Sequence, residues 1–451
     1  MKHKLSKRLT IIPTYLIFMV SFIFAGSLHA GLVIDITEGV EGALPIAVSP
    51  FLMPDNAVVK KTGQGLTDIA SVIRNDLRRS GLFSPLSVNQ LPASPTIKST
   101  INFQRWKGSG TENLVVGDIK RMGKNHYEVS FKMYDIYTKQ QILSSRFNAT
   151  KAKLRRVAHK ISDLIYEKLT GVKGDFDTLL CYIVARGSKN KSYTLMVSDS
   201  DGFNEQTILR SKHPLMSPSW SPNGKRLAYV SFEKRRSIVY VQELKTGKRK
   251  IVASYKGINS SPRWSPDGKR IAVALSKDGN AEIYIIYVNS GVTQRITRHY
   301  GIDTEPQWTP DGKKLIFTSD RGGKVQLYEI NVGSKGRAGN PRRLTFEGKY
   351  NARGSYSPDG ESITYITREN GAYRVAIMTL ANASIAVLTQ SKLDESPSFS
   401  PNGKSIIYAT QLRGKGVLQI VPVDGGVSPQ RLRVNSGDVR EPSWSGFRIK
   451  Y

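Results

Sequence analysis

The chain has 451 residues, of which 39% are hydrophobic and 23% are charged, and its formal net charge is +31. The length predicts two or three domains, and the composition excludes a disordered chain. The single cysteine, Cys181, excludes an intramolecular disulfide, so a large core must supply the stability.

Residues 1–30 read as a secretory signal. Basic MKHKLSKR precedes apolar IIPTYLIFMVSFIFAG, and Ala30 offers a small residue at the cleavage point. An uncleaved membrane anchor is the alternative. Because no later stretch reaches the length of a membrane span, the mature chain is expected to carry no transmembrane segment.

Residues 31–171 are predicted to form a mixed α/β domain. Residues 31–39 and 45–53 resemble strands, and Leu66 to Leu77 follow helical spacing before Gly81. Three strand candidates follow at 113–122, 126–138 and 141–150. A second helix spans 154–169, and its basic face is either solvated surface or a site for an acidic partner: Lys151, Lys153, Arg155, Arg156 and Lys160.

From residue 175 to residue 451 the pattern is that of a six-bladed β-propeller. A turn such as SPDGK at 265–269 occurs five times, each copy following an aromatic residue. The aromatic positions recur every 43 to 48 residues, the length of one four-stranded blade: Trp220, Trp264, Trp308, Tyr356, Phe399 and Trp444. Three strands at 178–212 and one at 442–451 together complete the sixth blade, which closes the ring.

The repeated turn is interpreted as scaffold. Proline and glycine satisfy the backbone of a tight turn, and the preceding aromatic is expected to pack between adjacent blades. SPNGKS at 400–405 lacks the first glycine and the strand-to-helix context of a phosphate loop. No nucleophile elbow or zinc-protease motif occurs, and the histidines lack metal-ligand spacing, so no enzyme, cofactor or metal is expected.

Six loops precede the aromatic residues and should rim one mouth of the central channel. On so basic a chain, five acidic residues there are unexpected: Asp303, Glu305, Asp394, Glu395 and Glu441. They could bind a basic peptide segment or a hard cation, or they could be ordinary polar loop residues. The dispersed net charge itself fits acidic partners, anionic lipid or a solvated surface. Because no basic stripe interleaved with aromatics is present, nucleic acid is not an expected partner.

At 193–233, YTLMVSDSDGFNEQTILRSKHPLMSPSWSPNGKRLAYVSFE resembles the TolB family, as do GIDTEPQW and LDESPSFSPNG. The resemblance implies a non-enzymatic, monomeric periplasmic adaptor of the Tol–Pal system in cell division and outer-membrane integrity. Its implied partners are the outer-membrane lipoprotein Pal and the inner-membrane protein TolA, with other outer-membrane proteins as further candidates. A propeller that binds small ligands or accompanies a hydrolase is the alternative.

The resemblance also implies the binding residues. The Pal surface would fall on the channel rim, at Asn259, Ser260, Ser261, Asp303, Thr304, Glu305, Asp394, Glu395 and Glu441. The family often has His where this chain has Ile258. TolA would bind the segment that follows signal cleavage, which is Gly31, Leu32, Val33, Ile34, Asp35, Ile36, Thr37 and Glu38. This segment begins with Gly-Leu, where an acidic start is familiar.

Overall fold

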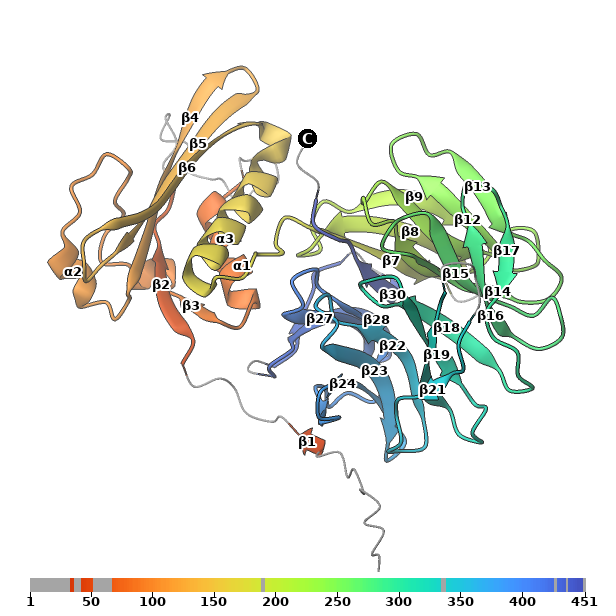
Figure 1. Ribbon diagram of the computed structural model, residues 1–451. Coiled ribbons are helices and arrows are strands. Elements are labelled where there is room, and N and C mark those ends of the chain that lie inside the picture. The colour runs from red at the N-terminus through yellow and green to blue at the C-terminus, as the bar shows by residue number, and fades with distance from the viewer. Residues whose placement is uncertain are drawn as a thin grey trace, which may run out of the picture. The chain divides into compact units, whose positions relative to one another are not determined.

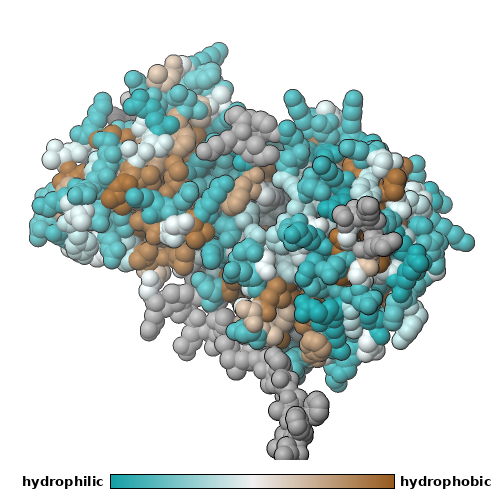
Figure 2. Space-filling view, viewed as in Figure 1, coloured by the Kyte–Doolittle hydropathy of each residue, from teal (hydrophilic) through white to brown (hydrophobic). Residues whose placement is uncertain are grey.

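The structure, a computed structural model, describes residues 33–35, 42–51, 67–187, 191–333, 338–425, 428–434 and 437–448. The expected signal at 1–30 lies outside these ranges. Within them, no helix is both long and apolar enough to cross a membrane. The face drawn in Figure 2 is mostly hydrophilic, as the charged content of the chain predicts.

The N-terminal domain is a five-stranded sheet with two helices packed on it (Figure 1). The sheet order is β3-β2-β4-β5-β6, in which β2 runs parallel to β3 and β4 and the other pairs are antiparallel. The strands are β2 (Leu44–Val48), β3 (Phe83–Pro85), β4 (Asn113–Gly123), β5 (His126–Asp135) and β6 (Gln141–Thr150). The helices are α1 (Ile69–Arg79), α2 (Phe103–Lys107) and α3 (Leu154–Thr170), with 3-10 turns η1 (Val88–Gln90) and η2 (Lys151–Lys153).

The ends of both long helices follow local chemistry. The side chain of Asp68 accepts a hydrogen bond from Ser71 N at 3.0 Å and so caps α1. Gly171 ends α3 with a φ of 73°, a left-handed conformation that glycine adopts without strain. The apolar stripes of α1 and α3 then pack into one core with the sheet, as the helical spacing predicts.

The second region is a propeller of six sheets in the described residues, as predicted (Figure 1). Blade 1 joins β30 (Asp438–Trp444) to β7 (Leu179–Arg186), β8 (Ser192–Asp199) and β9 (Gln206–Ser211). Blade 2 is β10 (Leu215–Trp220), β11 (Arg226–Ser231), β12 (Ile238–Glu243) and β13 (Arg249–Ala253). Blade 3 is β14 (Asn259–Trp264), β15 (Arg270–Leu275), β16 (Glu282–Tyr287) and β17 (Thr293–Arg295).

The remaining blades follow the same antiparallel order. Blade 4 is β18 (Asp303–Trp308), β19 (Lys314–Ser319), β20 (Gln326–Asn331) and β21 (Arg342–Arg343). Blade 5 is β22 (Asn351–Tyr356), β23 (Ser362–Glu369), β24 (Ala372–Thr379) and β25 (Ile385–Val387). Blade 6 is β26 (Glu395–Phe399), β27 (Ser405–Leu412), β28 (Lys415–Pro422) and β29 (Gln430–Arg431). The chain ends therefore meet in blade 1, which closes the ring.

The repeated turn and its aromatic residue both join neighbouring blades. Trp264 is buried in a core cluster with residues of blades 2 and 3. In the turn that follows, Gly268 N donates to Ser265 O at 2.9 Å, and glycine has a φ of 66°. A Cβ on this glycine would meet Pro222 of the preceding blade at 3.7 Å, so adjacent turns stack. The motif is scaffold, as interpreted from the sequence.

Candidate functional site: the propeller channel and its mouth

Each of the six inner strands contains the same backbone irregularity. A break in register separates the start of the strand from its end, for example between Ser260 and Arg263. One non-glycine residue per blade sits at the break with a φ between 49° and 58°: Ser217, Ser261, Glu305, Arg353, Ser396 and Glu441. Left-handed backbone is uncommon for such residues and concentrates at binding sites. We call these six residues the left-handed ring.

The left-handed ring carries a charged network across the channel. Arg353 Nε lies 2.9 Å from Glu305 Oε1, and its Nη1 donates to Ser396 Oγ. Thr318 Oγ1 donates to the other oxygen of Glu305 at 2.9 Å. The backbone N–H of Ser217 donates to Glu441 Oε2. Burial lowers the pKa of Arg353, but Glu305 and Glu441 outweigh burial and raise this pKa above its usual value.

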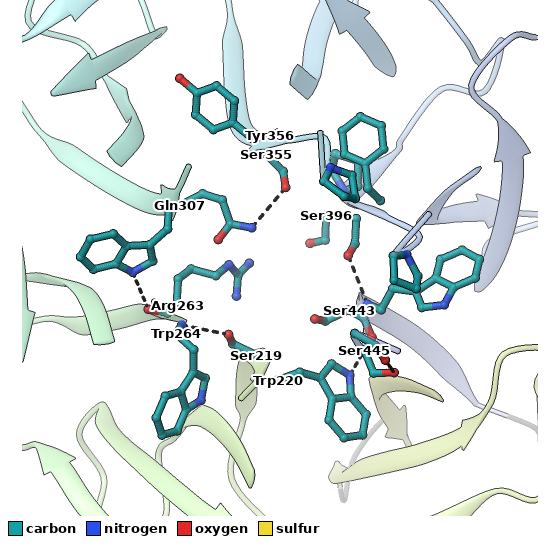
Figure 3. A pocket seen from close by; sticks show the side chains of 18 of the residues that line it. Ser219, Trp220, Arg263, Trp264, Gln307, Ser355, Tyr356, Ser396, Ser443 and Ser445 are labelled. Atoms are coloured by element: carbon teal, nitrogen blue, oxygen red, sulfur yellow. Dashed lines mark hydrogen bonds between the residues drawn. The ribbon is translucent and has the colours of Figure 1, made fainter. Parts of the chain in front are cut away.

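Two cavities meet at this network. One of about 470 Å³ is lined by residues from all six inner strands and the turns after them (Figure 3). The other, of about 300 Å³, is lined by residues of blades 5 and 6, by residues just before their inner strands, and by β30. Arg353 lines both cavities, so its guanidinium lies at the boundary between them.

Three of the predicted rim residues are buried and hold their own blades together. Asp303 is 0% exposed, accepts from Ser319 Oγ at 2.6 Å and pairs with Arg321 at 2.5 Å. Asp394 is 4% exposed and accepts from two hydroxyls of the preceding loop. Asn259 is 0% exposed and bonds the backbone of Tyr255. Asp303 therefore lines neither of the two cavities, whereas Asp394 lines the smaller one with its carboxylate held by these hydroxyls.

The other predicted residues lie on or near the channel. Glu305, Glu441 and Ser261 line the larger cavity, and Glu395 lines the smaller one. Ser260 and Thr304 are partly exposed at the starts of their strands. Burial raises the pKa of Glu395, with Glu441 acting in the same direction and Arg353 against it. The acidic residues thus form two separate groups.

The sequence analysis named Ile258 only as a departure from the family and missed the other apolar side chains at the same mouth. Ile258, Ile302 and Leu393 precede the inner strands of blades 3, 4 and 6 and are 50%, 53% and 46% exposed. Tyr300, two residues before Ile302, is 86% exposed. We call these four residues the mouth patch. The signal was an apolar residue directly before a buried polar one, as in Ile258-Asn259, Ile302-Asp303 and Leu393-Asp394.

The segment expected to bind TolA, Gly31 to Glu38, is described only at its centre. There β1 (Val33–Asp35) pairs in parallel with β25 of blade 5, with Ile34 opposite Ala386. The rest of the segment lies outside the described residues. Three residues therefore add a fifth strand to the edge of a blade (Figure 1).

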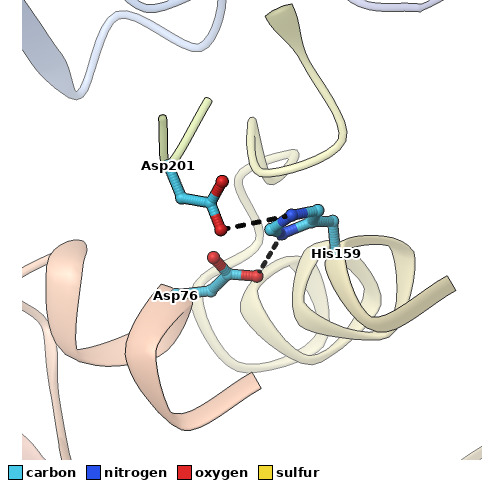
Figure 4. A group of neighbouring side chains, drawn as sticks. All are labelled: Asp76, His159 and Asp201. Carbon is cyan, nitrogen blue, oxygen red and sulfur yellow. Dashed lines mark hydrogen bonds and ion pairs between the residues drawn. The ribbon is translucent and has the colours of Figure 1, made fainter. Parts of the chain in front are cut away.

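One buried cluster joins α1, α3 and the loop after β8 (Figure 4). His159 Nδ1 lies 2.7 Å from Asp76 Oδ2, and its Nε2 lies 3.5 Å from Asp201 Oδ2. Arg79 and Arg155 contact the same two carboxylates. Although these three ligand-type side chains lie within 4.8 Å, the guanidinium groups already balance the carboxylates, so the arrangement is that of an ion-pair cluster.

The basic face of α3 accordingly has partners in the same chain. Arg155 contacts Asp201, and Arg156 Nε binds both oxygens of Asp177 at 3.0 and 3.1 Å. Arg155 and Arg156 are therefore neither fully solvated nor free to bind an acidic partner.

Comparisons with known proteins agree with this architecture. Residues 32–142 match the family model of the TolB amino-terminal domain, and residues 166–448 match that of the TolB beta propeller domain. A protein of Xylella fastidiosa strain M12 named Tol-Pal system protein TolB is 48% identical over 98% of this chain and 99% of its own length. A protein of the same name from Xanthomonas oryzae pv. oryzae is 49% identical over 93% of this chain and 94% of its own.

A crystal structure of TolB from Acinetobacter baumannii has the same fold. Its TM-score is 0.81 at 38% identity, and the match covers 92% of this chain and all of that one. With both family models matched and near-complete coverage of relatives, the mixed α/β domain and the six-bladed propeller together place this chain in the TolB family.

Proposed function

We propose that the protein is a periplasmic, non-catalytic adaptor of the Tol–Pal system that binds Pal at the channel mouth and TolA through its N-terminal segment. The observation that carries the proposal is the mouth patch, because it sets exposed apolar side chains around a channel in a member of the TolB family. We take the domain limits as 31–171 and 175–451, after a signal at 1–30.

The chemistry of the mouth suits a protein partner. Ile258, Ile302 and Leu393 precede the inner strands of three different blades, so exposed apolar side chains are distributed around the mouth. Glu395 and Arg440 line the smaller cavity near this surface and supply charges of both signs. An apolar centre with polar groups around it is the usual composition of a protein interface.

Calorimetric titration with the purified soluble domain of Pal tests the mouth patch. Ile258→Asp and Leu393→Asp should each weaken Pal binding about tenfold or more, as expected for apolar residues at the centre of an interface. Val292→Asp is the matched control, because Val292 is 58% exposed on the β16–β17 turn, away from the inner strands. Unchanged affinity in both mouth variants would place the Pal contact elsewhere.

The alternative is a propeller that binds a small ligand or accompanies a hydrolase. A pull-down from an envelope extract separates the two functions, since an adaptor should recover both Pal and TolA. Recovery of neither, with Pal and TolA present in the extract, would contradict the proposal. The short β1–β25 pairing supports the TolA assignment, because three residues of backbone pairing can be released and offered to the sheet of a partner.

A further inference from the structure

The larger cavity has a second ring, one step further along each inner strand from the left-handed ring. Its members occupy equivalent positions two residues after the left-handed residue, and all line the cavity (Figure 3). Five carry small or neutral polar side chains and one carries a guanidinium: Ser219, Gln307, Ser355, Ser398, Ser443 and Arg263. We call this set the donor ring, because hydrogen-bond donors outnumber acceptors in it.

Arg263 has fewer partners than its charge requires. Its Nη1 donates to the backbone oxygens of Pro218 at 3.4 Å and Pro262 at 3.2 Å. In the described part of the chain, its Nη2 and Nε donate to no protein atom, and no carboxylate lies within 4 Å of it. Figure 3 shows the guanidinium directed into the channel. A guanidinium has five N–H groups and cannot discharge by losing a proton, so the remaining donors need an acceptor.

The neighbouring hydroxyls add further donors. Ser219, Ser355 and Ser398 each accept one hydrogen bond, from Trp264 N, Gln307 Nε2 and Trp444 N respectively. Among the residues that the structure describes, none of these three hydroxyls donates a hydrogen bond to protein. Within the described residues, the buried indole N–H of Trp264, a residue of the cavity wall, also has no acceptor. The N–H groups of Arg263 and the serine hydroxyls that donate to no protein atom are therefore available to an acceptor bound in the cavity.

The nearest acidic side chains are already engaged elsewhere. Glu305 accepts from Arg353 and Thr318, and Glu441 accepts from the backbone of Ser217. These bonds hold both carboxylates in the left-handed ring, one step away from Arg263. Burial lowers the pKa of Arg263, with Glu441 opposing this change, as expected for a cation that lacks a close counterion.

We propose that the donor ring is an anion site in which Arg263 binds a single carboxylate group within the larger cavity. A carboxylate matches the planar fork of a guanidinium, and its second oxygen can accept from the serine hydroxyls. One cation faces the site and two carboxylates lie beyond it, so a monoanion is favoured over a multiply charged phosphate. A free organic acid and the carboxylate of a peptide share this chemistry.

Binding of three small probes to the purified protein tests the proposal, with saturation-transfer NMR and titration of thermal stability as readouts. N-acetylglycine presents a peptide-like carboxylate, acetate presents a free one, and N-acetylglycinamide is the neutral control. N-acetylglycine should bind, and N-acetylglycinamide should not. Arg263→Met should weaken carboxylate binding about tenfold or more, since it removes a charge-assisted pair. Arg105→Met, at an exposed arginine of α2, should change nothing.

Each outcome decides the proposal. If acetate and N-acetylglycine both bind through Arg263, the site accepts free acids. If only N-acetylglycine binds, the site reads a peptide carboxylate. The proposal is overturned if the wild-type protein binds neither carboxylate, if N-acetylglycinamide binds as well as the acid, or if Arg263→Met binds as tightly as wild type. Pal binding to the mouth patch is measured separately, so either result stands without the other.

Discussion

His159 of α3 directs Nδ1 at Asp76 of α1 over 2.7 Å, with both side chains almost completely buried. On its other side, Asp201 of the loop after β8 lies 3.5 Å from Nε2. Ser162 donates to the same oxygen of Asp76, while Arg79 and Arg155 contact the two carboxylates. The imidazole of His159 therefore lies between two carboxylates that belong to distant parts of the chain.

This cluster predicts pH-dependent stability. Burial lowers the pKa of His159, but Asp76 and Asp201 outweigh burial and raise it above its usual value. A raised folded-state pKa contributes stability that is complete below the unfolded-state value of about 6.5 and is lost as pH rises through the folded-state value. The melting temperature should therefore fall above neutral pH, and His159→Gln should flatten this fall.

Calorimetric melting between pH 5.5 and pH 8.5 checks the sign. At pH 5.5, His159→Gln should cost about 1.5–3 kcal/mol, because it removes hydrogen bonding to a charged group. His126→Gln is the control, since His126 is exposed at the start of β5. A pH profile of His159→Gln that parallels the wild-type profile would rule out this role.

The sequence analysis places Asp303 on the partner-binding rim, but this residue forms a buried ion pair with Arg321. Replacing Asp303 should therefore lower the stability of the fold. Asp303→Asn keeps the shape but removes the charge, which leaves Arg321 uncompensated beside Ser319. Breaking such a pair costs about 3–5 kcal/mol. Chemical denaturation should show this loss, with exposed Glu347→Gln as the neutral control. Equal stability of Asp303→Asn and wild type would return Asp303 to the set of rim contacts.

Repeats and periodicity predicted most of the fold. The aromatic spacing identified six blades and the joining of both ends in blade 1, because each repeat carries the same turn and the same buried aromatic. Short elements such as α2 and β3 were missed, since five or three residues are too few to show a period.

The candidate site was harder to predict. Sequence order places Asp303 and Glu305 two residues apart, but the break in register sends one into its blade and the other into the channel. The recurring proline after the left-handed residue, with Gly354 in its place in blade 5, was the available signal. The contacts of His159 with Asp76 and Asp201 depend on tertiary structure alone.

We expect Trp444 to stabilise the closed ring both by its buried side chain and by one hydrogen bond. This residue pairs with Leu180 in blade 1, and its Nε1–H donates to Thr178 Oγ1 at 2.8 Å. Trp444→Ala should cost about 3–5 kcal/mol through lost burial. Trp444→Phe keeps a ring of the kind that Phe399 supplies in blade 6, so it should lose only about 1 kcal/mol with the hydrogen bond. Thermal unfolding measures both, and equal melting temperatures for the two variants would contradict a packing role.

Deleting the N-terminal segment 31–38 should change the binding of partner proteins but hardly change the stability of the propeller. β1 contributes three paired residues to the edge of blade 5, whereas the blade itself has four strands of its own. Deleting 31–38 should therefore change propeller stability by less than about 1 kcal/mol, because short edge pairing adds little to an existing sheet.

The same deletion should abolish TolA binding and leave Pal binding measurable with a changed affinity, since coupled sites affect each other by equal factors. Replacing 31–38 by a Gly-Ser segment of equal length separates loss of sequence from loss of length. TolA binding by the Gly-Ser variant would refute the assignment of the segment, and Pal affinity identical to wild type would keep the TolA site but remove the coupling.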